Sequence, residues 1–356
     1  MLEQLTALLN EYQDAFHQQV PRYRQNRYVQ IVVLRETKSH AIFTTEGQTL
    51  DVERLQAGLL SRKQIDRAIM YKRKQIAPER RTGKALMRGL GILDAPQTAS
   101  SKKGTKVAKS IQPSECQIMG GSCGICPDCI LYGFAATTGN GSQRARVLTD
   151  SGFVVRDLQQ VMRNIKLNAI QDTVAGGIAG SAFAGRENIL PQVFMPTVET
   201  LLDVTLPEFL YVLGNILKTT RYGAESNREG FVRNHILGIY WSDVELFSNL
   251  ELTQRYYDAL AGTSADQKLP DYLDLQLFLE HWPAIESAAL SQVVGRTRTM
   301  DNLAELLEGV RNLYHDEKVL RSLFQELARQ SKQYVDTMKS KDKDADNDLS
   351  EEDAEA

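Results

Sequence analysis

The sequence of 356 residues has little cysteine and no long apolar run. No stretch reaches the eighteen or so consecutive apolar residues that a membrane-spanning helix needs. Residues 1–20 lack the basic start and following apolar run of a secretory signal peptide. We therefore expect a cytoplasmic protein, and the length allows one elaborate domain or two.

Motifs of the common enzyme classes are also missing. The chain has no G-x-x-x-x-G-K-[ST] phosphate loop and no H-E-x-x-H metal motif. Its five histidines are scattered, and none lies beside a second one in a ligand pattern. These absences argue against a conventional enzyme.

Charge is segregated along the chain, although the formal net charge is only −3. Between Arg62 and Lys109 there are fourteen Lys and Arg residues against three acids. A basic block of this density indicates a polyanionic partner, or else a solvated face. Residues 342–356 hold eight acids and one Lys, and with little apolar surface to bury we expect residues 339–356 to be a disordered acidic tail.

All the cysteines lie in one short stretch with the spacing C-x6-C-x2-C-x2-C: Cys116, Cys123, Cys126 and Cys129. Thiolates this close can converge on one ion, and four soft sulfur ligands with no open position favour a structural Zn²⁺. An iron–sulfur cluster is the main alternative, because C-x2-C-x2-C also occurs in ferredoxin-type sequences. A disulfide pair is disfavoured, since nothing else suggests export.

Hydrophobic patterns predict the following elements. Apolar residues at helical spacing predict helices over residues 2–19 and from Ser61 to Ile76, the second stopped by Pro78. The β-branched run Tyr28–Arg35 and the segment His235–Trp241 predict strands, and residues 147–205 are expected to be rich in β-structure. A further helix is expected from Pro207, and the chain becomes helical beyond residue 251. Together these patterns predict an α+β protein.

Aromatic residues stand beside cations in three places: Arg22–Arg24, Tyr71–Lys74 and Arg221–Tyr222. Cations neutralise phosphates and aromatic rings stack on bases, so this pairing is typical of nucleic-acid binding. Each place taken alone is better explained by an amphipathic side chain at a sheet edge. Three such places together with the basic block favour nucleic acid as the partner.

Two segments resemble a known family. Asn168–Asp172, a Gly/Ala-rich excursion and Ile189–Pro196 resemble the thumb of backbone subunits in class 1 CRISPR effector complexes. Thr219–Arg233 resembles the glycine-containing loop of the same RAMP superfamily, although it holds only two glycines. With the opening strand and the four-cysteine insertion, the chain is most similar to the backbone subunit of the type I-D effector (Cascade) complex.

The resemblance implies an RRM (ferredoxin)-like palm that carries an inserted zinc-binding subdomain, a thumb hairpin and a helical C-terminal part. The expected divisions are residues 1–94 (N-terminal helix and first part of the palm), 95–147 (zinc-binding insertion), 148–250 (rest of the palm, with the thumb at about 168–196 and the loop at 219–233), 251–338 (helical part) and 339–356 (tail).

The resemblance also implies a function. The chain would bind guide RNA (crRNA), polymerise with further copies of itself in a helical filament along the spacer, and present the guide to a target DNA strand within a larger complex. The residues expected to contact RNA are Arg22, Arg24, Lys72, Arg73, Lys74, Arg144, Arg146, Phe183, Arg221, Arg228 and Arg233, with Phe183 as a wedge between bases.

Two alternatives stay open. The chain could be a RAMP-type endoribonuclease that cuts paired target RNA, with Glu36, Glu46, Asp51 or Asp172 as the acidic residue, although no base or metal motif accompanies any of them. It could also be an iron–sulfur redox protein, in which case the purified protein would be brown.

Overall fold

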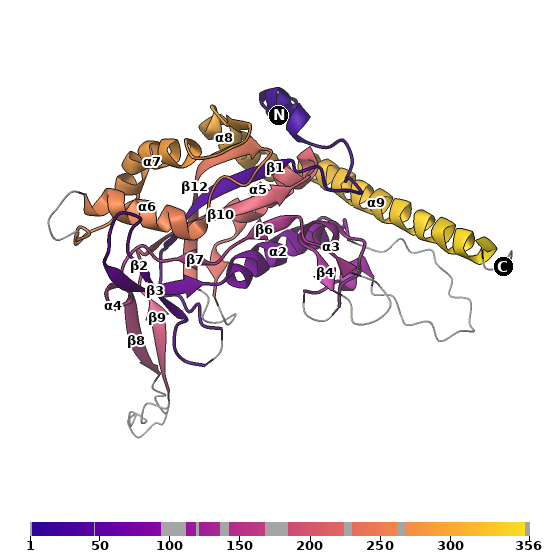
Figure 1. Ribbon diagram of the computed structural model, residues 1–356. Helices are drawn as coiled ribbons and strands as arrows, with labels where there is room; N and C mark the ends of the chain where they lie inside the picture. The colour runs from indigo at the N-terminus through magenta and orange to yellow at the C-terminus, as the bar shows by residue number, and fades with distance from the viewer. Residues whose placement is uncertain are drawn as a thin grey trace, which may run out of the picture.

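A computed structural model (Figure 1) describes residues 2–45, 47–93, 112–118, 121–135, 142–167, 184–223, 230–262 and 268–352. Over these ranges the protein combines helices with antiparallel sheets. The predicted α+β class is therefore confirmed.

The main sheet in the described chain has the strand order β11-β12-β1-β10-β6, and β13 also pairs with β12. The strands are Arg221–Tyr222 (β11), Gly230–Ser242 (β12), Tyr28–Thr37 (β1), Phe194–Leu202 (β10), Val147–Thr149 (β6) and Thr297–Thr299 (β13). Every residue of β1 after Tyr28 is buried, as its β-branched composition favours. The strands predicted at Tyr28–Arg35 and His235–Trp241 are confirmed.

Side chains of β1 alternate between two cores, because neighbours on a strand point to opposite faces. Val29, Ile31 and Val33 belong to one core, and Val32 and Leu34 belong to the other. The first core is covered by α1 (Leu2–Leu8), α2 (Lys72–Gly89), α5 (Leu206–Lys218), α8 (Leu303–His315) and α9 (Glu317–Glu352), and the second by α6 (Asn249–Ala261) and α7 (Leu275–Leu290).

Helix α5 begins where the sequence predicts. Thr205 accepts a hydrogen bond from the Glu208 backbone N–H, and the Glu208 carboxylate accepts one from the Thr205 N–H. This reciprocal capping satisfies two donors at the helix start. The helix predicted over residues 2–19 is shorter in the structure: α1 gives way to a 3-10 turn, η1 (Asn10–Ala15), and Phe16 is extended. Tyr12 in that turn stacks on Trp241, with ring centroids 3.9 Å apart.

The helix predicted from Ser61 to Ile76 is wrong. Gln64–Met70 forms strand β3, which pairs with β2 (Val52–Gln56) and β7 (Gly152–Phe153) in a separate sheet. The pairing of β3 with a strand on each side outweighs the helical preference that the spacing of its apolar residues suggests. Helix α2 starts only at Lys72 and contains Pro78, so the helix continues through the proline that was expected to stop it.

A two-stranded hairpin follows α4 (Leu158–Val161): β8 (Met162–Leu167) pairs with β9 (Ala184–Ile189). Its base is joined to the body, since Ala41 and Ile189 exchange backbone hydrogen bonds. Figure 1 shows this hairpin extending away from the main sheet. The expected thumb segment thus has a hairpin base, while its tip, including Phe183, lies outside the described residues.

Helix α9 runs to Glu352 and projects beyond the rest of the molecule (Figure 1). The sequence predicts disorder from residue 339, but the structure continues the helix, because residues 335–352 contain no Gly or Pro to end it. Among the described helices, none is long and apolar enough to cross a membrane. The remaining elements are η2 (Pro113–Glu115), α3 (Pro127–Tyr132), β4 (Phe134–Ala135) and β5 (Ser142–Gln143).

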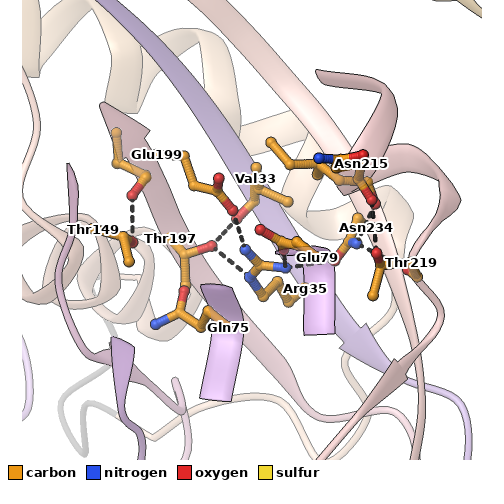
Figure 2. A network of polar contacts seen from close by, with 12 residues as sticks. Val33, Arg35, Gln75, Glu79, Thr149, Thr197, Glu199, Asn215, Thr219 and Asn234 are labelled. Atoms are coloured by element: carbon orange, nitrogen blue, oxygen red, sulfur yellow. Dashed lines mark hydrogen bonds and ion pairs between the residues drawn. The ribbon is translucent and has the colours of Figure 1, made fainter. Parts of the chain in front are cut away.

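A buried arginine joins α2 to the main sheet (Figure 2). The Arg35 guanidinium on β1 has no exposed surface, and it donates to Glu79 on α2 at 2.9 Å and to Glu199 on β10 at 2.7 Å. It also donates to Tyr222 on β11 and Asn234 on β12, each at 3.0 Å. One side chain therefore connects five elements, and both of its carboxylate partners are themselves fully buried.

Replacing Arg35 by Leu should lower the free energy of unfolding by about 3–5 kcal/mol, because the Glu79 carboxylate would stay buried without its cation and the Glu199 carboxyl group would lose its donor. The matched control is Arg54→Leu, since Arg54 is 68% exposed and its pair with Asp66 spans 3.8 Å. Its loss should be below about 1 kcal/mol. Urea unfolding measures both, and equal small losses would contradict the assigned role.

The buried carboxyl pair should also make stability depend on pH. Burial raises the pKa of Glu199 well above its ordinary value, and the neighbouring Glu79 carboxylate adds to this rise while Arg35 opposes it. The native state then keeps a proton that the unfolded chain loses above about pH 4.3. The contribution of Glu199 to stability is therefore complete below that pH and declines as the pH rises.

We expect Glu199→Gln to flatten this pH dependence, because glutamine keeps an acceptor for Arg35 without an ionisable proton. Unfolding should be measured in urea from pH 5 to pH 8 for the variant and the wild type. The stability of the variant relative to the wild type should increase with pH. A constant difference across the range would show that Glu199 is ionised throughout.

Candidate metal centre and basic surface

The four cysteines form one compact buried group. Their sulfur atoms all lie within 4.8 Å of one another. Cys116 Sγ is 3.5 Å from Cys129 Sγ and 3.8 Å from Cys126 Sγ, and Cys123 Sγ is 4.0 Å from Cys129 Sγ. A tetrahedral zinc with Zn–S bonds of about 2.3 Å would place its sulfurs about 3.8 Å apart. The donor set therefore suits a single ion, with no fourth position left open for a substrate.

The local backbone brings the thiols together. Cys126 precedes the first residue of α3 and Cys129 lies within that helix, so a single turn holds both. Gly124 has a φ of +73°, a conformation that favours glycine, and lets the chain turn between Cys123 and Cys126. The Cys126 N–H points at Cys123 Sγ at 3.3 Å, as expected for donors that stabilise a thiolate.

Cations from α2 compensate the negative charge of this group. Lys84 Nζ lies 3.0 Å from Cys116 Sγ and 3.1 Å from the Asp128 carboxylate. Arg80 donates to both oxygens of Asp128, at 3.0 and 2.7 Å. Arg88 donates to the Cys116 carbonyl at 2.6 Å. Residues 80, 84 and 88 are spaced by four along α2, which places them on one side of the helix toward the cysteines.

Lys84 is charged in this setting. Burial disfavours its ammonium form, but the Asp128 carboxylate and the Cys116 sulfur together raise its pKa above the ordinary value. Four thiolates and one Zn²⁺ carry a net charge of about −2, so a fixed cation beside them is stabilising.

The sequence analysis did not predict that Lys84, Arg80 and Asp128 lie beside the cysteines. The spacing of four between the basic residues of α2 was a signal that could have indicated it.

Most residues expected to bind RNA have exposed side chains. Arg22 and Arg24 are exposed on the segment before β1, where Arg22 lies over the Tyr23 ring at 5.1 Å. Lys72 and Arg73 are exposed at the start of α2, and Lys74 is half-buried. Arg144, Arg221 and Arg233 are exposed as well. Arg228 and Phe183 lie outside the described residues.

These cations form several groups rather than one site. β1 and β12 are antiparallel, and Tyr28 pairs with Ser242 whereas Thr37 pairs with Val232. The segment before Tyr28 therefore lies near one end of the main sheet, while Arg221 and Arg233 lie near the other end. Lys72 and Arg73 line a third place, a groove of 530 Å³ between α2 and the edge strand β6.

Arg146 differs from the rest of the predicted set. It is buried, forms a bidentate ion pair with the Glu208 carboxylate and donates a hydrogen bond to the Asp203 carbonyl at 3.1 Å. This guanidinium is needed inside the protein, where it neutralises the acid that caps α5. We therefore remove Arg146 from the RNA-contacting set.

Of the acidic residues considered for a nuclease, the two that the structure describes have separate structural partners. Glu36 is buried, with Lys38 on one oxygen and His235 at 2.9 Å on the other. Asp51 accepts from the Thr45 N–H at 3.0 Å. Glu46 and Asp172 lie outside the described residues.

The sequence profile of the family described as Csc2 Crispr matches residues 15–324. The chain belongs to the Csc2 CRISPR family. The CRISPR affiliation predicted from the thumb-like segment and the cysteine insertion is thus confirmed, whereas assignment to type I-D stays a prediction. No curated protein sequence matches the chain.

Solved structures add a likeness of fold. This Csc2 family member resembles the crystal structure of Thermofilum pendens Csc2 with a TM-score of 0.55 and 16% identity, over 94% of this chain and 98% of that one. A type IV-B CRISPR complex chain (TM-score 0.37, 14% identity, 59% and 90% of the two chains) and a CRISPR RNA-guided surveillance complex chain (0.41, 8%, 76% and 88%) are more distant. Only the first supports a shared fold.

Replacing Cys126 by Ser should remove the metal and lower the unfolding midpoint by about 10 °C or more, because metal binding contributes directly to folding. Ser122→Ala, in the same segment but outside the sulfur group, is the matched control. Metal content by mass spectrometry and thermal unfolding measure both effects. We expect about one zinc per chain in the wild type and the control, with a colourless protein.

Removing the metal with a chelator should produce the same metal-free protein as the Cys126→Ser substitution. A strong chelator should make residues 112–135 sensitive to protease in the wild type, and added Zn²⁺ should restore protection there but not in the Cys126→Ser variant. Unchanged metal content in the variant would contradict the assigned ligands. A brown protein absorbing near 400 nm would show an iron–sulfur cluster instead.

Proposed function

We propose that the chain is the guide-RNA-binding backbone subunit of a CRISPR effector complex of type I-D. It binds crRNA, polymerises with copies of itself along the spacer, and presents the guide for pairing with a target DNA strand in the cytoplasm. In this division of labour the protein holds the nucleic-acid backbone and base pairing reads the sequence. The observation that carries the proposal is the match to the Csc2 CRISPR family over residues 15–324.

The surface chemistry supports this proposal. The exposed cations at three places on the molecule are suited to the successive phosphates of one long strand. Two of these places carry an aromatic ring beside the cations, Tyr23 at 71% exposure and Tyr71 at the start of α2. Aromatic rings of this kind can stack on unpaired bases irrespective of sequence.

The architecture supports it as well. We propose that the main sheet and its helices form an RRM-like palm, that the β8–β9 hairpin is the base of the thumb, and that the cysteine group holds a structural zinc. A closed four-sulfur site stabilises the segment that carries the cysteines without taking part in a reaction. The chain is proposed to be non-catalytic, because the described acidic candidates Glu36 and Asp51 are engaged separately in structural contacts.

The proposal predicts RNA binding that depends on salt and on α2. The variant Lys72→Glu/Arg73→Glu should bind single-stranded RNA at least about tenfold more weakly at low salt, and the slope of log affinity against log salt should fall by about 2. Filter binding with RNAs of unrelated sequence measures both quantities.

The control is Arg62→Glu/Lys63→Glu, which makes the same charge change on the exposed β2–β3 connection. Its affinity for RNA should be closer to that of the wild type than to that of the Lys72→Glu/Arg73→Glu variant. Wild-type protein without affinity for RNA at low salt would refute the proposed function. Equal weakening in the two variants would mean that binding depends on net charge rather than on α2.

A further inference from the structure

The four sulfurs of the cysteine group come from two separate parts of the chain. Cys123, Cys126 and Cys129 follow one another at intervals of three residues and belong to one turn, which leads into α3. Cys116 lies seven residues before this turn, at the end of η2, where the backbone is extended (φ −60°, ψ 122°). The turn gathers three sulfurs by its local geometry. The fourth sulfur depends on a contact from elsewhere to stay beside them.

Helix α2 provides that contact. Lys84 Nζ lies 3.0 Å from Cys116 Sγ, and Arg88 donates a hydrogen bond to the Cys116 carbonyl at 2.6 Å. Because positions 84 and 88 are about one turn apart on the helix, the two side chains reach Cys116 from the same side. The turn itself adds one longer contact, from the Cys123 N–H to Cys116 Sγ at 3.4 Å. Helix α2 therefore holds both the sulfur and the backbone of Cys116.

Asp128 joins the same helix to the turn. It lies in the first turn of α3, is fully buried, and accepts hydrogen bonds from Arg80 at 3.0 and 2.7 Å. The Lys84 ammonium lies 3.1 Å from the same carboxylate, so this one group bridges Asp128 and Cys116. Figure 1 shows α3 beside α2. A single buried side chain thus connects the fourth cysteine with the turn that carries the other three.

The charge of Lys84 serves the sulfurs more than it serves Asp128. Arg80 already donates to both oxygens of that carboxylate, so Asp128 has a cation without Lys84. Burying an ammonium group is costly unless it is compensated, yet only 2% of Lys84 is exposed. Four thiolates around a Zn²⁺ ion carry a net charge of about −2. The Lys84 ammonium beside Cys116 offsets part of this charge, which accounts for its burial.

We propose that Lys84 and Arg88 are positioning residues of the metal centre: they hold Cys116 against residues 123–129, so that its sulfur completes the ligand set. Asp128 keeps the Lys84 ammonium in place for this role. Without the two cations, the turn would bind an ion by three sulfurs, and a water molecule would fill the fourth position, as in open zinc sites. The inference rests on the zinc site proposed above and is independent of RNA binding.

The metal and α2 would then stabilise each other. Full affinity for the ion requires a docked α2, because this helix positions the fourth sulfur, and a bound ion in turn stabilises the docked helix. Loss of Lys84 leaves α2 joined to the turn through Arg80 and Asp128 and joined to the main sheet through Glu79 and Arg35. Substitution of Lys84 should therefore weaken the metal site in a protein that still folds.

Two substitutions of Lys84 separate its charge and hydrogen-bond donors from its bulk. Lys84→Met keeps a side chain of similar length without charge or donor, whereas Lys84→Arg keeps both. Cys116→Ser is the reference for a site with three sulfurs, and Lys63→Met, at an exposed position, is the matched control. Circular dichroism establishes whether each full-length protein is folded.

Cobalt is the probe for the number of sulfur ligands, because the absorbance from sulfur-to-Co²⁺ charge transfer grows with each thiolate bound. Lys84→Met and Cys116→Ser should each give about three quarters of the wild-type absorbance per bound ion, since three sulfurs of four remain. Zn²⁺ affinity, measured by competition with a chelator, should fall about 10- to 100-fold in Lys84→Met, the range for residues that orient a metal ligand. Lys84→Arg should restore most of both values, and Lys63→Met should match the wild type.

A Lys84→Met protein with the cobalt spectrum and the zinc affinity of the wild type would overturn the inference. A Lys84→Met protein that fails to fold while Cys116→Ser stays folded would overturn it too, because Lys84 would then serve the core rather than the metal. Arg88→Met gives an independent measurement at an exposed position. It should lose zinc affinity several-fold, and an unchanged affinity would contradict the role of Arg88.

These outcomes differ from failure of the proposed function. A wild type that binds neither Co²⁺ nor Zn²⁺ refutes the proposed metal site. A wild type that binds metal by four sulfurs, with the same result in Lys84→Met, refutes only the positioning role. RNA binding of the wild type enters neither measurement, so a protein without affinity for RNA refutes the proposed function and leaves the positioning role intact.

Discussion

The structure depends on one buried cation. Arg35 lies in the middle of the main sheet and bonds side chains from α2 and three neighbouring strands. Two carboxyl groups and one guanidinium in a dry interior are costly unless each is held in place by hydrogen bonds. The network therefore fixes how α2 lies against the sheet and does not merely fill space.

Helix α2 is the element that links the core to the surface chemistry. Glu79 attaches one side of it to Arg35, while Arg80 and Lys84 attach it to Asp128 beside the cysteine group. Both attachments use its inner residues. Lys72 and Arg73 at its start are exposed, so the cysteine group, by fixing this helix, would support the proposed RNA binding indirectly.

Sequence reasoning was most successful where local composition decides the structure. The β-branched strand Tyr28–Arg35, the helix predicted from Pro207 and the convergence of four cysteines all follow from residues close in the chain. It failed for residues 64–70, where pairing with β2 and β7 outweighed a helical pattern. It also could not assign Arg35 and Arg146 to buried ion pairs, because their partners Glu79, Glu199 and Glu208 are 44, 164 and 62 residues away.

The central claim is that this Csc2 family member holds guide RNA on the surface that α2 presents. Mapping the ultraviolet cross-links between the protein and the RNA that copurifies with it tests this most directly. We predict RNAs with shared flanks and variable spacers, cross-linked to peptides that contain Tyr71 and Tyr23. Copurified RNA of random origin, or cross-links confined to α7 and α8, would contradict the account.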